Sequence, residues 1–139
     1  MKGSLGDQLK AIGVVSKNIQ QFEIYSVPDE AIDFPEERLG QKRQKHEKRL
    51  VIVLQNNQDN REPILKIVTV APLSTGAQSH RLDYLLRKND HPFLRADSFI
   101  RIQHVQPILK KDLTTKFGTV TGESFRDDIR DRLFSLLDL

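Results

Sequence analysis

The chain is 139 residues long, with 37% hydrophobic and 29% charged residues and no cysteine or tryptophan. This length and composition fit one folded domain of ordinary size and exclude a disordered or collagen-like chain. The lack of cysteine excludes disulfides, thiolate metal sites and cysteine nucleophiles. It also removes any argument for an oxidising compartment, so we expect a cytoplasmic protein.

The net charge of +3 is unevenly distributed along the chain. Six of the twelve residues from Arg38 to Arg49 are Lys or Arg and only Glu47 is acidic, so this stretch carries +5 and the remainder sums to −2. A local excess of cations is typical of a surface that binds phosphate groups, although a merely solvated face is the plainer interpretation. A polyanionic partner is therefore expected at this stretch.

Residues 1–20 are weakly amphipathic and are expected to form an extension to a domain that spans residues 21–139. Their longest apolar run, residues 11–15, is too short for a signal peptide or a membrane span, so no membrane association is expected. The β-branched and aromatic residues of Gln21–Val27 predict a first strand that Pro28 stops. The following twenty residues hold few apolar side chains and predict a long loop, of the kind that usually carries function.

The middle of the chain predicts two further strands. Leu50–Leu54 is a continuous apolar run that suits a strand buried on both faces, and the polar Gln55–Pro63 predicts a turn. The next strand is Leu65–Val70, and we expect Ala71–Leu73 to leave it because Pro72 lacks an N–H. Residues 74–79 (STGAQS) predict a small polar loop.

Two more strands are expected further along, at Leu82–Leu86 and Ser98–Val105. The second alternates apolar and polar residues, as a half-buried strand does, and Pro107 is expected to end it. Residues 108–117 are expected to form one or two helical turns.

The last segment predicts an amphipathic helix with Thr121 or Ser124 as its N-cap. Its apolar face is formed by Phe125, Ile129, Leu133, Leu136 and Leu137. Several short strands followed by one terminal helix indicate a mainly β (α+β) fold, a small antiparallel barrel closed by the helix.

Common catalytic and nucleotide-binding motifs are missing from the sequence, including GxGxxG, GxxxxGK[ST], HExxH and GxSxG. The four histidines, His46, His80, His91 and His104, lack the spacing of metal ligands. We therefore expect neither a metal nor another cofactor.

The order of the remaining patterns resembles the MazF/PemK/Kid toxins of bacterial toxin–antitoxin modules, over roughly residues 21–139. The matching segments are KRLVIVLQNN, VAPLST, DSFIRIQHV, a glycine and the terminal helix. The family's arginine before the second strand is matched by Arg49, and its A-P-L-T-S pattern by residues 71–75. The chain departs from the family at Leu50, where a proline is usual, and at Gln103–Gln106, which replace a D/E-Q-I-R run.

The resemblance implies an SH3-like barrel, usually a homodimer, that cleaves single-stranded RNA without a metal and is held inactive by a cognate antitoxin. The implied reaction is attack of a ribose 2′-OH on the adjacent phosphorus, which leaves a 2′,3′-cyclic phosphate and a 5′-OH end. Such a reaction needs a proton acceptor, a proton donor and groups that stabilise the extra charge on phosphorus.

Candidate residues follow from these requirements. Arg49 suits the charge role because a guanidinium offers a planar fork and stays protonated, and Ser74 or Thr75 can add a hydroxyl hydrogen bond. The proton acceptor stays open among His46, Glu47 and His104, of which His104 is placed at the catalytic site. The residues expected to grip the RNA backbone are Arg38, Lys42, Arg43, Lys45, His46 and Lys48.

Structural interpretations of the same residues compete with these. Arg49 could be the last exposed cation before a buried strand, Ser74 and Thr75 could cap a turn, and His104 could be a half-buried strand residue. A non-catalytic binder of RNA, or of gyrase as in the related CcdB toxins, is the alternative function. The gyrase version is disfavoured because the sequence ends in Leu-Leu-Asp-Leu rather than in the Trp-Gly-x segment of those toxins.

Overall fold

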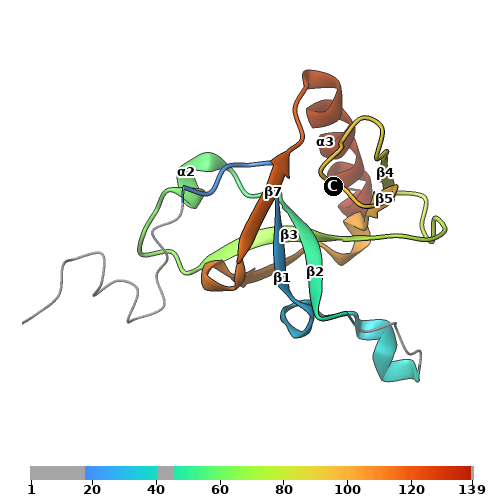
Figure 1. Cartoon of the computed structure of the whole chain (residues 1–139), viewed down its shortest axis with the longest axis horizontal. Helices are drawn as coiled ribbons and strands as arrows, with labels where there is room; N and C mark the ends of the chain where they lie inside the picture. The colour runs from blue at the N-terminus through green and yellow to red at the C-terminus, as the bar shows by residue number, and fades with distance from the viewer. Residues whose placement is uncertain (1–17, 41–45, 139) are drawn as a thin grey trace, which may run out of the picture.

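The computed structural model describes residues 18–40 and 46–138 and contains one curled antiparallel sheet with a C-terminal helix beside it (Figure 1). The strand order is β4-β5-β3-β2-β1-β7, and β6 also pairs with β3. The strands are β1 Glu23–Pro28, β2 Lys48–Val53, β3 Ile67–Ser74, β4 Tyr84–Leu86, β5 Ser98–Ile100, β6 Gln106–Leu109 and β7 Thr115–Thr119. The α-helices are α2 Asn57–Asn60 and α3 Glu123–Leu137, and short 3-10 helices are η1 Asp29–Ala31, η2 Pro35–Leu39, η3 Ile102–His104 and η4 Lys110–Asp112. This curled half-barrel with its helix confirms the predicted fold class.

The two faces of the central strands β1, β2 and β3 bury separate apolar clusters. Ile24 and Ile52 pair across β1 and β2 and belong to the cluster on the α3 side, whereas Val51 and Val53 belong to the cluster on the other face. All four side chains are fully buried. The apolar run of β2 is therefore buried on both faces, as predicted. Of the predicted N-terminal extension, residues 1–17 lie outside the described residues and Ile19 is buried in the second cluster.

Helix α3 packs on the sheet through Phe125 and Ile129, which are buried as predicted. The Phe125 ring makes edge contacts with Phe22, at 5.1 Å between centroids, and with Tyr84 of β4, at 5.2 Å. Leu137 is 65% exposed, so the apolar face is buried only in part. The predicted capping side chains are wrong: the N-cap is Gly122, at φ 114°, and makes no side-chain cap hydrogen bond.

Contact between the β4–β5 connection and β7 brings the two edges of the sheet together. Phe93, from this connection, lies directly over Gly118 of β7, where an added Cβ would be 2.5 Å from the ring. Because β4 and β7 are the two ends of the strand order, this contact helps to curl the sheet into a half-barrel. A side chain at position 118 would occupy the same space as the ring.

Strand β3 does not end at Val70, as predicted, but continues through Pro72 to Ser74. The Pro72 carbonyl accepts a hydrogen bond from the Arg101 N–H, so the backbone of Pro72 faces the side on which β6 and β5 pair with β3. Pairing with β6 ends at Val70 and pairing with β5 begins at Leu73. The missing N–H of Pro72 therefore falls at the changeover between two partner strands, where no ladder bond is lost.

The predicted strand Ser98–Val105 is shorter than expected, because β5 ends at Ile100 and the chain turns through η3. Pro107 does not end a strand but lies within β6, which pairs only with β3 among the described strands and so tolerates a proline. Of the one or two helical turns predicted at residues 108–117, one is observed, the 3-10 turn η4. That segment holds the end of β6, the 3-10 turn η4 and most of β7.

The remaining differences are small. The predicted turn Gln55–Pro63 contains α2, whose N-cap Asn56 accepts a hydrogen bond from the Asp59 N–H at 2.9 Å. The predicted strand Leu82–Leu86 begins at Tyr84, and the predicted long loop holds η1 and η2.

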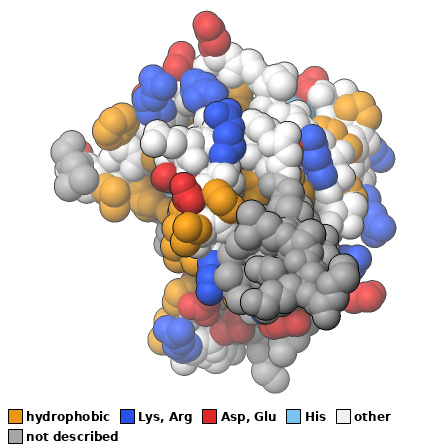
Figure 2. Space-filling view, turned by 90° about the vertical axis from the view of Figure 1, so that its left-hand side faces the viewer, with side chains coloured by type: hydrophobic (Ala, Val, Ile, Leu, Met, Phe, Trp, Pro, Cys, Tyr) orange, Lys and Arg blue, Asp and Glu red, His pale blue; other side chains and the backbone are white. Residues whose placement is uncertain are grey.

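Apolar and charged side chains are interspersed on the described surface. Figure 2 shows apolar side chains in several patches between Lys and Arg on the face that lies at the left of Figure 1. Two exposed apolar residues, Ile67 and Leu109, pair across β3 and β6 and are 43% and 41% exposed. Within residues 18–40 and 46–138, no helix is long and apolar enough to span a membrane.

Candidate active site

Arg49 is buried, which excludes the interpretation that it is an exposed cation before the strand. It lies in β2 opposite Val27 of β1 and is 8% exposed. Its Nε donates to Asp29 Oδ1 at 3.1 Å and its Nη1 donates to the Leu73 carbonyl at 3.4 Å. These two bonds engage two of the five N–H groups that a guanidinium carries.

The position of Asp29 follows from the end of β1. Pro28 is the last residue of the strand and pairs with Lys48, so the chain turns into η1 beside Arg49. Asp29 is 5% exposed, and the resulting ion pair is buried on both sides. A buried arginine needs such a partner, because an unpaired buried charge is strongly unfavourable. No pattern in the sequence indicated Asp29.

The pairing of β2 with β3 brings Arg49 next to Ser74. The pairing of the two strands ends at Val51 and Pro72. Beyond that point the Arg49 side chain still reaches β3, because its Nη1 donates to the carbonyl of Leu73, the residue before Ser74. Two predicted site residues from separate strands are therefore neighbours, and Thr75 follows them as an exposed residue.

Phe34 connects Arg49 with His104. The Arg49 guanidinium carbon lies 5.0 Å from the centroid of the Phe34 ring, and the His104 ring centroid lies 4.9 Å from it. A guanidinium over an aromatic face is favourable because of the negative charge density of that face. Arg49 and His104 thus share one aromatic neighbour.

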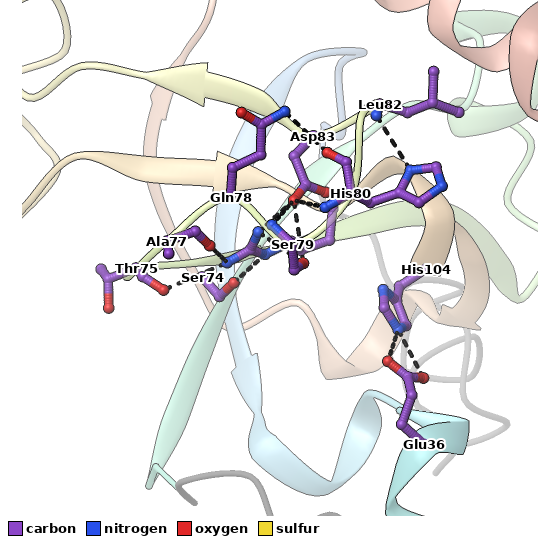
Figure 3. Close-up of polar contacts among 11 residues, drawn as sticks. Glu36, Ser74, Thr75, Ala77, Gln78, Ser79, His80, Leu82, Asp83 and His104 are labelled. Atoms are coloured by element: carbon purple, nitrogen blue, oxygen red, sulfur yellow. Dashed lines mark hydrogen bonds and ion pairs between the residues drawn. The ribbon is translucent and has the colours of Figure 1, made fainter.

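His104 forms a carboxylate–imidazole pair with Glu36 of η2. Its Nε2 lies 2.8 Å and 3.0 Å from the two Glu36 carboxylate oxygens (Figure 3). Backbone hydrogen bonding within η2, together with the hydrogen bond and charge of His104, holds the pKa of Glu36 below its ordinary value. His104 is a residue of η3, so the prediction that it lies in a strand is wrong. Among the described residues its Nδ1 is buried without a hydrogen-bond partner.

Gln106 attaches the loop before η2 to the strand after η3. Its side-chain Oε1 accepts from the Asp33 N–H at 2.9 Å and its Nε2 donates to the Asp33 carbonyl at 3.0 Å. This pair of hydrogen bonds keeps η2 and η3 together, and with them Glu36 and His104.

The Ser74 hydroxyl accepts a hydrogen bond from Nε of Arg101. Arg101 is itself buried and forms an ion pair with Asp83. No motif in the sequence indicated this contact. Figure 3 shows Ser74 and Asp83 in one group of contacts and His104 with Glu36 in another.

The predicted RNA-gripping residues are only partly described. Arg38 is exposed and forms an ion pair with Asp33 at 3.4 Å, and His46 and Lys48 are exposed. Lys42, Arg43 and Lys45 lie outside the described residues. No group of three or more His, Asp or Glu side chains suited to a metal ion occurs in the described part of the chain.

The curled half-barrel with its C-terminal helix has the fold of a class of small toxins. Residues 20–136 match the family model described as the PemK-like, MazF-like toxin of type II toxin–antitoxin systems. The chain therefore belongs to this toxin family, which confirms the resemblance seen in the sequence. No curated protein has a matching sequence.

Solved structures with the same fold come from several bacteria. MazF from Deinococcus radiodurans aligns with a TM-score of 0.65 and 13% identity, over 89% of this chain and all (100%) of that chain. The Mycobacterium tuberculosis toxin MazF-mt6 aligns with a TM-score of 0.61 and 18% identity, over 84% of this chain and 97% of that one. A mycobacterial endoribonuclease in complex with its cognate antitoxin aligns with a TM-score of 0.61 and 16% identity, over 87% and 96% of the two chains. At these identities the likeness concerns the fold.

Proposed function

We propose that this toxin is an endoribonuclease that cleaves single-stranded RNA by attack of a ribose 2′-OH on its own phosphodiester, without a metal. The products would be a 2′,3′-cyclic phosphate and a 5′-OH end. The observation that carries this proposal is the hydrogen bond from the buried Arg49 guanidinium to the carbonyl of Leu73, the residue that precedes Ser74.

Arg49 and Ser74 supply the groups that the charged transition state needs. The attack puts additional negative charge on the phosphoryl oxygens, and oriented N–H and O–H donors stabilise that charge. Asp29 holds the guanidinium in one orientation through Nε, and the N–H groups that it does not engage are the ones proposed for the phosphate. Ser74, or the exposed Thr75, would donate a hydroxyl hydrogen bond to the same group.

His104 is the proposed proton-transfer residue, with Glu36 as its partner. A carboxylate 2.8 Å from Nε2 orients the imidazole, as the partner of a proton-transfer histidine does. His104 and Arg49 both contact the Phe34 ring, so the two groups belong to one proposed site. His46 and Glu47 stay alternative proton acceptors.

RNA would reach the site along the basic stretch between residues 38 and 49, and we propose that its cations bind the backbone phosphates. Arg38 and Lys48, at the two ends of the stretch, are exposed as this role requires. We further propose that the toxin is a homodimer and that a cognate antitoxin inhibits it. One solved relative is a toxin bound to its cognate antitoxin, which supports the latter proposal.

A non-catalytic RNA binder is the second candidate, and the burial of Arg49 against Asp29 favours it. A guanidinium that is neutralised by a carboxylate has less net charge to offer a phosphate. Such a protein would bind RNA with a salt-dependent affinity and release no cleavage product.

A variant series at Arg49 tests the proposal. Wild-type protein, free of antitoxin, is incubated with single-stranded RNA in EDTA beside Arg49→Lys and Arg49→Ala. Lysine keeps the charge but loses the planar fork, so we expect each variant to lose about a hundredfold or more in kcat. Arg126→Ala, which removes an exposed arginine from α3, is the control and should cleave as wild type does. Full activity of Arg49→Ala would remove Arg49 from the reaction.

A further inference from the structure

The side chain of Arg101 is the centre of a hydrogen-bond network that organises the loop after β3. Each of its five N–H groups has an acceptor, and all five acceptors come from residues 74–83. The acceptors are Ser74 Oγ, the Thr75 carbonyl (3.5 Å), the Ala77 carbonyl (3.2 Å), Ser79 Oγ (3.2 Å) and Asp83 Oδ2 (2.5 Å).

Asp83 neutralises this buried guanidinium and holds the far end of the same loop. Its Oδ2 also accepts hydrogen bonds from the backbone N–H of Ser79, at 2.9 Å, and of His80, at 3.0 Å (Figure 3). Burial by itself would raise the pKa of Asp83, but these N–H groups and Arg101 together hold the pKa below its ordinary value. The charge of Asp83 therefore balances that of Arg101, and the network holds the loop at both of its ends.

Apolar packing contributes little to the order of this loop. Residues 75–79 are all exposed, and Gly76 takes φ 99°, in the left-handed region that lets the chain turn around the guanidinium. With no buried side chain between Leu73 and Leu82, polar contacts must hold the loop in place. Arg101, the residue that follows β5, supplies most of those polar contacts.

We infer that Arg101 is a positioning residue, which fixes the 74–79 loop and assigns the Ser74 hydroxyl its role as a donor. This inference rests on the proposed RNA cleavage. A hydroxyl has one hydrogen to donate, and because Arg101 Nε–H occupies the oxygen, that hydrogen is left for another acceptor. The acceptor is a phosphoryl oxygen of the RNA. The bonds to the Thr75 and Ala77 carbonyls hold the backbone of the loop, and hence Ser74, in place next to Leu73, whose carbonyl accepts a hydrogen bond from Arg49.

Kinetics of Arg101→Lys, Ser74→Ala and the double variant test this role. Lysine preserves the charge opposite Asp83 but has three donors and no fork, so the loop loses part of its support. We expect Arg101→Lys to lower kcat by about a hundredfold, as displacement of a catalytic group by about 1 Å does, with little change in KM. If Arg101 acts through Ser74, the double variant loses no more than Ser74→Ala alone.

Lys110→Met is the matched control for removing a buried cation. Lys110 is 2% exposed and its Nζ donates to the carbonyls of Asp59, Asn60 and Glu62, far along the sequence from the 74–79 loop. It should lower stability and leave kcat as in wild type. Equal kcat losses in Arg101→Lys and Lys110→Met, or multiplicative losses in the double variant with Ser74→Ala, would overturn the positioning role.

A spectroscopic measurement separates this inference from the proposed function. In 1H–15N NMR spectra, Ser74→Ala should shift the Arg101 Nε–H resonance because that group loses its acceptor, and Lys110→Met should leave it in place. A resonance that is insensitive to Ser74→Ala would refute the Arg101–Ser74 contact, whether or not RNA is cleaved. Absence of cleavage by the wild type, with the shift present, would refute the proposed function and leave the contact standing.

Discussion

Replacing Gly118 with alanine tests how the half-barrel is held together. The added Cβ would lie 2.5 Å, 2.6 Å and 2.9 Å from Cδ1, Cε1 and Cγ of Phe93. Carbon atoms pack at about 3.5 to 4.0 Å, so the ring must move by about 1 Å or the edge strand β7 must shift. Such overpacking typically costs about 1 to 3 kcal/mol, and we expect Gly118→Ala to lower the free energy of unfolding by this amount.

The effect of Gly118→Ala on the free energy of unfolding should change sign in a variant that lacks the Phe93 ring. In a Phe93→Ala background nothing opposes the new Cβ, and alanine in a strand is favoured over glycine by about 0.5 to 1 kcal/mol. Gly118→Ala should therefore stabilise that background. The assay is urea unfolding of all four proteins, with midpoints compared at an unchanged m value. The same destabilisation by Gly118→Ala in both backgrounds would refute the contact between the β4–β5 connection and β7.

Two further predictions concern charge. Because the folded-state pKa of Asp83 is below its unfolded value, its contribution to stability is present above about pH 4 and is lost as pH falls through the folded pKa. Urea midpoints of Asp83→Asn should thus fall less steeply than those of wild type below about pH 4; parallel curves would contradict the network around Arg101. In the basic stretch, replacing Lys42, Arg43 and Lys45 with glutamine should weaken single-stranded RNA binding and reduce the salt slope by about 2, whereas an unchanged slope would assign these cations to solvent.

The sequence was sufficient for the parts of the fold that rest on continuous apolar patterns. Strand β2 and helix α3 were predicted close to their observed bounds because their runs of apolar residues match the burial that each element needs. The 3-10 turn η3 was missed because three residues show no period that differs from a strand. The end of β3 was predicted too early because Pro72 lacks an N–H. The strand accommodates this proline because its pairing changes there from β6 to β5.

In the site, the order of the sequence motifs predicted Arg49 and Ser74 but none of the residues that contact and orient them. Asp29, Phe34 and Arg101 contact them from distant segments, and each by itself has the pattern of an ordinary surface or loop residue. Such contacts depend on strand register and on the turns after β1 and β3. These features are set by tertiary packing rather than by local composition.

The most direct test of the account is the chemistry of the RNA ends. Purified toxin, free of antitoxin, is incubated with a single-stranded RNA in EDTA beside Arg49→Ala, and the products are examined for end groups. We predict fragments with a 2′,3′-cyclic phosphate and a 5′-OH from the wild type and intact RNA from the variant. Intact RNA in both reactions, under conditions in which the wild type is folded and binds the RNA, would contradict the account and establish a non-catalytic binder.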